Sequence, residues 1–340
     1  MLPLQQVKRS CAASPHAQDF VASNPWIGIS VGVIAPSSPS PLFFNYGALD
    51  HAAPPVTQDT LFSINSMTKV FTALALAESV VAGRVGLNDT VQSHTKHAMP
   101  RDGDAEFWLL DLATHWSGLP VRPDNLPNPD YYNYTDDMFF AFMANYSFPE
   151  LHVRKQYYYS NCAFGLLASV ITAMQDQHFR SMCRRLFFSP LSMTLSGLAT
   201  DPQPAAPYAT GHMSNGTALP RGVSDEAVLG SWAIASTARD MLLFLDAHLR
   251  YGSGNSSGGL LGDAVRLAQQ PVRPTDDPEY GIGLGWRTQL STNVRLKTGS
   301  GDGFESCMMC VMMARRALAF AAVTREQVQR GACDCIGCAG

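Results

Sequence analysis

Charged side chains are scarce in this sequence of 340 residues: they make up 15% of the chain, against 46% hydrophobic residues. Globular proteins usually carry about a quarter charged residues, and disordered chains combine low hydrophobicity with high net charge. The composition therefore excludes a mainly disordered chain. The formal net charge is −4 and there is no long run of lysine and arginine, which argues against a nucleic-acid partner.

Apolar runs long enough to cross a bilayer are also lacking. A membrane-spanning helix needs roughly 18 or more predominantly apolar residues, and the longest candidate, 70–82, is interrupted by three polar residues. We therefore expect no membrane span. The first 25 residues contain two basic residues but no following apolar run of the kind that a secretory signal has, so no signal peptide is visible in the sequence.

The uses of the eight cysteines cannot be settled from their spacing. Three of them, Cys333, Cys335 and Cys338, crowd a glycine-rich C-terminus, but no histidine follows to complete a zinc site. No His-x-Glu-x-x-His motif occurs elsewhere. We predict neither a metal ion nor another cofactor, and we interpret 326–340 as a flexible Cys/Gly-rich tail. The roles of the cysteines stay open.

Strand-like segments lie near both ends of the chain and helical patterns lie between them. Apolar, β-branched runs separated by turn residues predict strands over 26–34, 42–47, 294–297, 304–313 and 317–324. Apolar periodicity predicts helices over 66–82, 108–114, 136–145, 162–174, 177–188 and 236–249. Strands, then helices, then strands indicate an α+β fold: an antiparallel sheet built from both chain ends, flanked by helices, with a mainly helical inserted subdomain.

The expected domain organisation follows from this order. We expect an N-terminal segment over 1–25 and one main domain over 26–325. Within that domain, about 26–80 and 230–325 form the α/β part and about 81–229 the helical part.

Three short motifs occur in order: Ser66-Met-Thr-Lys69, Tyr159-Ser-Asn161 and Lys297-Thr-Gly299. A Ser-x-x-Lys match by itself is weak, because about one in three chains of this serine and lysine content contains one by chance. However, the chain has only five lysines, and two of them lie in these motifs. Their joint occurrence in this order favours a chemical role over chance.

The first motif is suited to nucleophilic chemistry. A helix that begins at Ser66 places Ser66 and Lys69 on one face, and the unpaired N–H groups and dipole at a helix start favour an oxyanion. A lysine among apolar side chains and near another cation has a lowered pKa, so its neutral amine can act as a base. The alternative is an ordinary N-cap serine followed by an exposed lysine.

The other two motifs complete a reaction site. Two nearby ammonium groups would stabilise the Tyr159 phenolate and make it a general base, and Asn161 can both donate to and accept from a substrate amide. Lys297 and Thr298 can hold a substrate carboxylate. Gly299 leaves a strand edge open for substrate, and the Ser300 N–H would complete an oxyanion hole with that of Ser66. The structural alternatives are an aromatic cluster with a helix cap, and a cationic strand end.

These motifs and their separations of 93 and 231 residues resemble the class C β-lactamase and penicillin-binding DD-peptidase family of serine hydrolases. The resemblance covers about 26–325, and the phrases around Leu112, Tyr159 and Thr324 are most similar to its AmpH-like DD-carboxypeptidase/endopeptidase branch. No Ser-Asp-Asn triplet occupies the middle position, which argues against a class A β-lactamase. The resemblance implies a β-lactamase/transpeptidase-like fold and a periplasmic or secreted location.

The resemblance also implies roles for the motif residues. Ser66 would form the acyl-enzyme, Lys69 and Tyr159 would move its proton, Asn161 would hold the substrate amide, and Lys297 with Thr298 would bind a carboxylate. The substrate would be a β-lactam, a D-alanyl peptide from peptidoglycan, or a simple ester. The family uses the motif around His115 for loop structure, so we do not assign His115 to catalysis.

Three alternatives remain from the sequence. An esterase or acyltransferase can use the same scaffold, and a binding or scaffolding protein can keep the fold without turnover. A metal-dependent hydrolase is the third. The intact motifs argue against the second and the missing ligand motifs against the third. The sequence also departs from the family in its short N-terminal helix, expected at 18–23, and in lacking a helix after the last strand.

Overall fold

The computed structural model describes residues 15–36, 38–127, 133–148, 152–201, 205–221, 226–254, 258–311 and 316–323, with 15, 16 and 316–323 described through their backbone. The tail predicted at 326–340, with its three cysteines, lies outside the described residues. No helix in the described ranges is long and apolar enough to cross a membrane.

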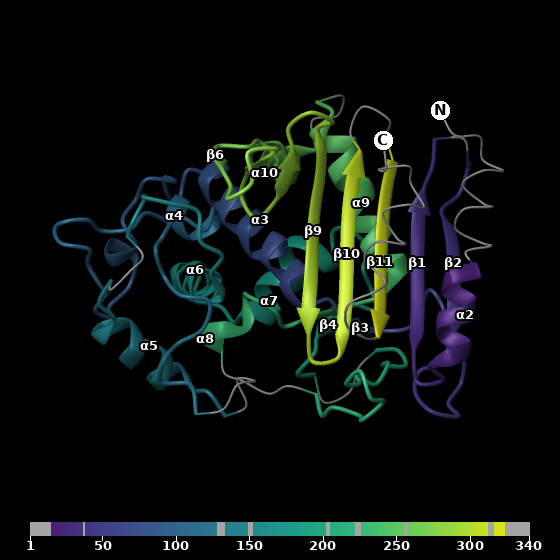
Figure 1. Ribbon diagram of the computed structural model, residues 1–340. Coiled ribbons are helices and arrows are strands. Elements are labelled where there is room, and N and C mark those ends of the chain that lie inside the picture. Colours follow the sequence, from purple (N-terminus) through teal and green to yellow (C-terminus); the bar gives the residue numbers. More distant parts are fainter. Residues whose placement is uncertain are drawn as a thin grey trace.

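An eight-stranded antiparallel sheet joins the two ends of the chain (Figure 1), and its strand order is β2-β1-β11-β10-β9-β8-β7-β6. Two strands come from the N-terminal part: β1 (Gly28–Ile34) and β2 (Leu42–Gly47). The others come from the C-terminal part: β6 (Arg273–Pro274), β7 (Tyr280–Ile282), β8 (Arg287–Gln289), β9 (Val294–Gly301), β10 (Phe304–Val311) and β11 (Arg316–Val323). Strand β11 pairs with both β1 and β10, so the predicted α+β fold with a sheet from both ends is confirmed.

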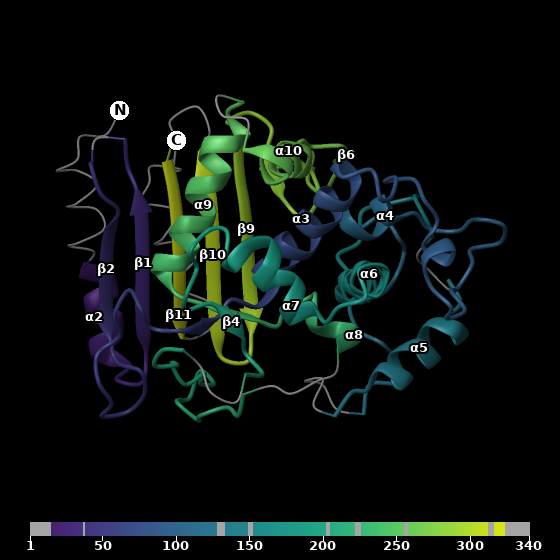
Figure 2. The ribbon, with the colours of Figure 1, turned by 180° about the vertical axis from the view of Figure 1, so that it is seen from behind.

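Helices cover the face of this sheet that is turned toward the reader in Figure 2. Helix α9 (Ala238–Gly252) packs on β1, β10 and β11, and α10 (Gly259–Ala268) packs on α9 and on α3 (Thr68–Val81). Helix α2 (Pro15–Ser23) contacts β2. The burial patterns of β1 and β10 are nearly continuous rather than alternating, which is typical of strands that are buried on both faces.

The inserted part is mainly helical and lies beside the sheet on the side of β6 and β9 (Figure 1). Its longest helices begin at side-chain caps: Thr135 accepts from Met138 N at the start of α5, and Ser160 accepts from Ala163 N at the start of α6. Its elements are η2 (Val91–His94), α4 (Leu109–Ala113), α5 (Asp136–Asn145), α6 (Asn161–Met174), α7 (Phe179–Cys183), the π-helical turn η3 (Arg184–Phe188) and α8 (Glu226–Leu229).

A second, three-stranded sheet supports the start of α3. Its order is β3-β5-β4, from β3 (Phe62–Ser63), β4 (Gly197–Leu198) and β5 (Ile234–Ser236). Strand β3 runs directly into the short 3-10 turn η1 (Asn65–Met67), which precedes α3 and contacts β9, β10 and β5. The turn η1, which carries Ser66, is therefore held between the two sheets.

The structure differs from several predicted boundaries. The helix predicted from Ser66 starts as the turn η1 and becomes α-helical only at Thr68, and the helix predicted over 177–188 is divided between α7 and η3. Helix α10 and the short strands β6–β8 were not predicted. Consecutive glycines hide the start of α10, and a strand of two or three residues is too short to show alternation.

Candidate active site

Ser66 lies at the junction of β3 and α3, next to a strained residue. Asn65 has a positive φ of 45°, a conformation that asparagine tolerates better than most residues. Its side chain is buried and donates from Nδ2 to the Gly301 carbonyl oxygen at 3.0 Å. This bond joins η1 to the far end of β9, so the backbone next to Ser66 is fixed against the sheet.

Lys69 lies one turn beyond Ser66 and is completely buried. Its Nζ is 3.0 Å from Ser66 Oγ, 2.8 Å from Asn161 Oδ1 and 2.7 Å from the Ser231 carbonyl oxygen. The predicted proximity of Ser66 and Lys69 is thus present in the structure. Burial, followed by the positive charge of Lys297, lowers the pKa of Lys69 well below its ordinary value.

The three contacts of Lys69 can accommodate a neutral amine as well as an ammonium group. The oxygens of Asn161 and Ser231 can only accept hydrogen bonds, so Nζ must donate to both. A neutral amine has two N–H groups for these acceptors, and its lone pair is then left for the Ser66 hydroxyl. The lowered pKa of Lys69 favours this neutral form, in which Nζ accepts from Ser66.

Tyr159 contacts the same serine from the other side. Its hydroxyl group is 2.8 Å from Ser66 Oγ, and its ring lies 5.1 Å from Lys69 Nζ and 4.9 Å from Lys297 Nζ. The two lysine side chains predicted beside this tyrosine are therefore present. Burial outweighs the hydrogen bond to Ser66 and raises the pKa of Tyr159 above its ordinary value, which favours the protonated phenol over the predicted phenolate.

His115 holds Tyr159 from behind rather than reaching Ser66. Its ring is buried 4.5 Å from the Tyr159 ring, and its Nδ1 accepts from the Ser160 N–H at 3.1 Å. Burial, followed by the charges of Lys297 and Lys69, lowers its pKa well below the ordinary value. A neutral imidazole in this position supports the loop that carries Tyr159, as the family resemblance implies.

A buried ion cluster anchors the loop that carries His115. Asp111 is fully buried and lies 2.8 Å from both Arg154 and Arg273. The Arg273 guanidinium also lies 5.5 Å from the Trp116 ring, whose Nε1 donates to the Pro274 carbonyl at 3.1 Å. These contacts tie the helical part to β6 of the main sheet, and so set the distance across the site.

Strand β9 forms the opposite wall, and half of its edge is free of a neighbouring strand. Strand β8 pairs only with Val294–Leu296, which leaves the stretch 297–301 unpaired on that side within the described sheet. An added Cβ at Gly299 would lie 2.2 Å from the Ile64 oxygen and 3.0 Å from Ser66 N. Only glycine lets the strand approach the nucleophile this closely.

Lys297 stands at the start of this free edge. Burial, followed by the positive charge of Arg287 on β8, lowers its pKa to about 8. Thr298 and Ser300 are exposed along the same stretch, and Ser300 Oγ donates to Glu305 Oε1 at 2.5 Å. The structure therefore brings together the residues predicted for the site: Ser66, Lys69, Tyr159, Asn161, Lys297, Thr298, Gly299 and Ser300.

Two participants were not predicted from the sequence. The Ser231 carbonyl, which holds Lys69, is set by contacts of α3 with the preceding loop: Thr72 Oγ1 donates to the Gly230 oxygen at 2.7 Å. A main-chain acceptor has no sequence signature. Arg287 was missed because its nearness to Lys297 depends on β8, a short strand that was not predicted.

Comparison with protein families agrees with this fold. A family model described as Beta-lactamase matches residues 17–333, nearly the whole chain. The chain therefore belongs to the Beta-lactamase family.

The sequence identity between this chain and individual curated relatives is low. The chain is 27% identical over 270 residues to "Beta-lactamase" of Yersinia enterocolitica and 27% identical over 264 residues to "Beta-lactamase" of Escherichia coli strain K12. Each alignment covers 76% of this chain, but only 64% and 65% of the relative, so the chain spans just under two thirds of their length. It is also 31% identical over 142 residues to "Protein flp" of Staphylococcus aureus, covering 40% of this chain and 27% of that protein.

Proposed function

We propose that this protein is a serine hydrolase that forms an acyl-enzyme on Ser66, and that β-lactams or acyl-D-alanyl-D-alanine peptides are its substrates. The observation that carries the proposal is the shared hydrogen bonding of one serine oxygen: Ser66 Oγ lies 3.0 Å from Lys69 Nζ and 2.8 Å from the Tyr159 hydroxyl group. A serine between an amine and a phenol has both a proton acceptor and a proton donor within reach.

Lys69 is the base for acylation in this proposal. As Ser66 Oγ attacks a carbonyl carbon, its proton moves to the neutral Lys69 amine. The resulting ammonium has three N–H groups and three acceptors already in place, namely Ser66 Oγ, Asn161 Oδ1 and the Ser231 oxygen. Only the contact with Ser66 changes direction, so the proton transfer needs little rearrangement of the site.

Tyr159 then serves as the acid. Because burial keeps its phenol protonated, it can give a proton to the leaving nitrogen of the substrate. The phenolate formed in this step lies between Lys69 and Lys297, each within about 5 Å of its ring according to the 5.1 and 4.9 Å separations. Lys69 returns the proton to it, which leaves both groups neutral for the second half of the reaction.

The edge of β9 orients the substrate in the same scheme. Backbone N–H groups of Ser66 and Ser300 stabilise the oxyanion, and Lys297 with Thr298 binds the substrate carboxylate. Asn161 Oδ1 accepts from Lys69, which leaves the Asn161 amide N–H groups to donate to the substrate carbonyl. The free edge at 297–301 can take an extended substrate as an added strand.

A class C β-lactamase and a D-alanyl-D-alanine carboxypeptidase or endopeptidase both fit this acylation chemistry, and they differ in how fast water removes the acyl group. We propose β-lactam hydrolysis as the first candidate, because the relatives that align over three quarters of this chain are named Beta-lactamase. An esterase is the second, since ester cleavage needs the same nucleophile without a leaving amine.

Steady-state rates on three substrate classes test the proposal: a penicillin, an acyl-D-alanyl-D-alanine peptide and a simple phenyl ester. We expect turnover of at least one class by the wild type, and none by Ser66→Ala or Lys69→Ala. Turnover of all three at wild-type rates by Lys69→Ala would contradict the role of the lysine. If the wild type hydrolyses the phenyl ester but neither the penicillin nor the peptide, the result would favour the esterase.

A further inference from the structure

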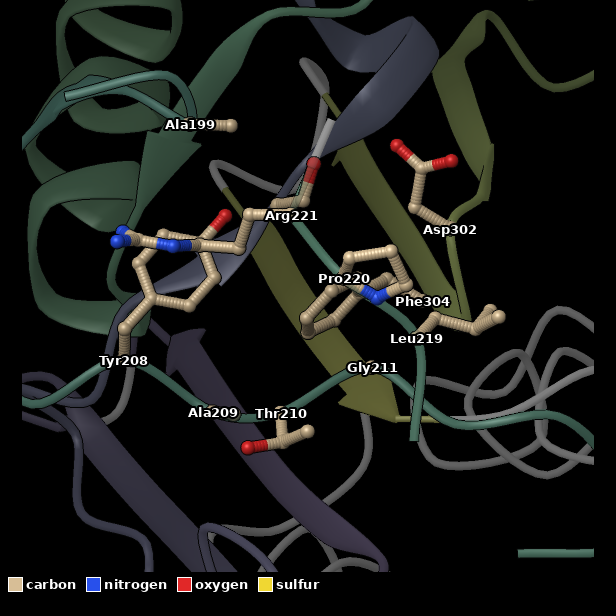
Figure 3. Close-up of a pocket in the computed structure, with 11 residues that line it drawn as sticks. Ala199, Tyr208, Ala209, Thr210, Gly211, Leu219, Pro220, Arg221, Asp302 and Phe304 are labelled. Atoms are coloured by element: carbon tan, nitrogen blue, oxygen red, sulfur yellow. The ribbon is translucent and has the colours of Figure 1, made fainter. Parts of the chain in front are cut away.

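A second pocket lies at the far end of β9, beyond the residues assigned to the reaction. It has a volume of about 330 Å³, is partly open to solvent, and is lined by the loop 205–221, by the β9–β10 turn and by the end of β3 (Figure 3). Its apolar lining includes Phe304, Leu219 and Pro220, and its charged lining consists of Arg221 and Asp302.

The loop is packed closely against the turn. An added Cβ at Gly211 would lie 2.0 Å from the Asp302 backbone oxygen, and the Tyr208 ring lies 6.1 Å from the Phe304 ring. The Tyr208 hydroxyl bonds to the Ser63 side chain, and Ser63 Oγ is 3.4 Å from Asn65 Oδ1. Ser63, which lines the pocket, is thus three residues before the nucleophile Ser66, and its side chain contacts that of Asn65, the residue next to Ser66.

Arg221 is the distinctive group in this pocket. Its guanidinium carbon lies 5.1 Å from the Tyr208 ring centroid, and Figure 3 shows the side chain crossing that ring. Within the described residues it forms no ion pair, and its one hydrogen bond is a contact of 3.4 Å from Nη1 to the Asp201 carbonyl. A guanidinium stacked on an aromatic ring keeps the N–H groups at its edge available for a carboxylate.

The position of the pocket relates it to the direction of the substrate. A substrate along the free edge of β9 has its carboxylate at Lys297, and the acyl part beyond the reacting carbonyl then runs past Ser300 toward Asp302. Arg221 therefore lies on the acyl side, beyond the end of the free edge that is opposite to Lys297. The site would be complementary to a substrate that is negatively charged at both ends.

We infer that the pocket binds the acyl side chain of the substrate and that Arg221 selects a side chain ending in a carboxylate. This inference rests on the proposed function, because the acyl side is defined by the direction in which Ser66 attacks. Asp302 lines the same pocket and repels such a group, so the two residues have opposite effects on selectivity.

Acylation of the protein by paired penicillins tests the inference. One member of each pair has an acyl side chain that ends in a carboxylate, and the other ends in the matched carboxamide; pairs of increasing chain length find the reach of the pocket. The measured quantity is the ratio of kcat/KM for acid over amide. We expect a ratio of roughly 5 at the best length for the wild type, a ratio near 1 for Arg221→Gln, and a higher ratio for Asp302→Asn.

Arg250→Gln is the matched control. Arg250 also lies over a tyrosine, 5.5 Å from the Tyr251 ring, but on α9 outside the pocket. Its substitution removes one positive charge and is expected to leave the acid-to-amide ratio unchanged. An equal fall in the ratio for Arg250→Gln would show that overall charge, not the pocket, sets the preference, and would overturn the inference.

Binding to Ser66→Ala separates this inference from the proposed function. That variant cannot be acylated at residue 66, so dissociation constants for the same acid and amide pairs report recognition alone. If the wild type is not acylated but Ser66→Ala still prefers the acid, and Arg221→Gln in that background removes the preference, the pocket is supported and the chemistry is wrong. A ratio near 1 in both experiments at all lengths refutes the pocket assignment.

Discussion

The pKa of Lys297 predicts how activity depends on pH for substrates that carry a carboxylate. Lys297 must be charged to bind a carboxylate, and burial, followed by the nearby charge of Arg287, lowers its pKa from 10.5 to about 8. Free enzyme with uncharged Lys297 accumulates as the pH rises through this value. We therefore expect kcat/KM for a penicillin to fall on the alkaline side, starting near pH 8.

The size of this effect follows from the ionisation. At pH 9 about one tenth of the molecules would keep Lys297 charged, so kcat/KM should fall about tenfold between pH 7 and pH 9. With an ordinary lysine pKa, the loss over this interval would be only a few per cent. A phenyl ester without a carboxylate should show no such fall, because it does not use the charge of Lys297.

Substitution of Arg287 tests the cause of the shift. Arg287→Gln removes a positive charge, so the pKa of Lys297 should rise and the alkaline fall should move to higher pH. Burial of Lys297 is unchanged in this variant, so the pKa should stay below 10.5. Initial rates at subsaturating substrate, measured from pH 6 to pH 11, provide the profiles. An alkaline fall at the same pH in both proteins, or the same fall for the ester, would refute the reasoning.

Three further substitutions test the geometry. Tyr159→Phe removes the hydroxyl that contacts Ser66 Oγ and should slow acylation by about 10²- to 10⁴-fold in stopped-flow measurements; a smaller effect would mean that the phenol is not the proton donor. Gly299→Ala forces a Cβ to within 2.2 Å of a backbone oxygen, so we expect a loss of about 1–3 kcal/mol in the free energy of unfolding together with slower acylation; an unchanged denaturation midpoint would contradict this. Asp111→Asn leaves two arginines without their shared buried carboxylate and should cost about 3–5 kcal/mol, measured by urea denaturation; a loss below about 1 kcal/mol would show that the ion cluster is not stabilising.

The sequence was most informative where chemistry requires particular side chains. Ser66, Lys69 and Lys297 could be selected because lysine is rare in this chain and the motifs occur in order, and the sheet could be predicted from apolar runs at both ends. The structure adds what depends on packing. The depth of burial decides that the pKa of Tyr159 rises although two lysines lie nearby, and burial is not visible in a list of neighbours.

Other features could not be predicted because they involve main-chain groups or irregular loops. The carbonyl of Ser231 becomes an acceptor for Lys69 only once α3 and its neighbouring loop have packed together. The pocket at Arg221 depends on a loop without regular structure that folds against the β9–β10 turn. Both require contacts between segments far apart in the sequence, which periodicity and local propensity do not encode.

Intact-mass analysis after mixing with a penicillin, sampled from seconds to hours and followed by peptide mapping, tests the central claim most directly. The account predicts one added acyl group on the peptide that contains Ser66, and none in Ser66→Ala. A lasting adduct would favour a D-alanyl-D-alanine peptidase, and a brief adduct with loss of the penicillin would favour a β-lactamase. An adduct on another residue, or on Ser66→Ala as readily as on the wild type, would contradict the assignment of Ser66 as the nucleophile.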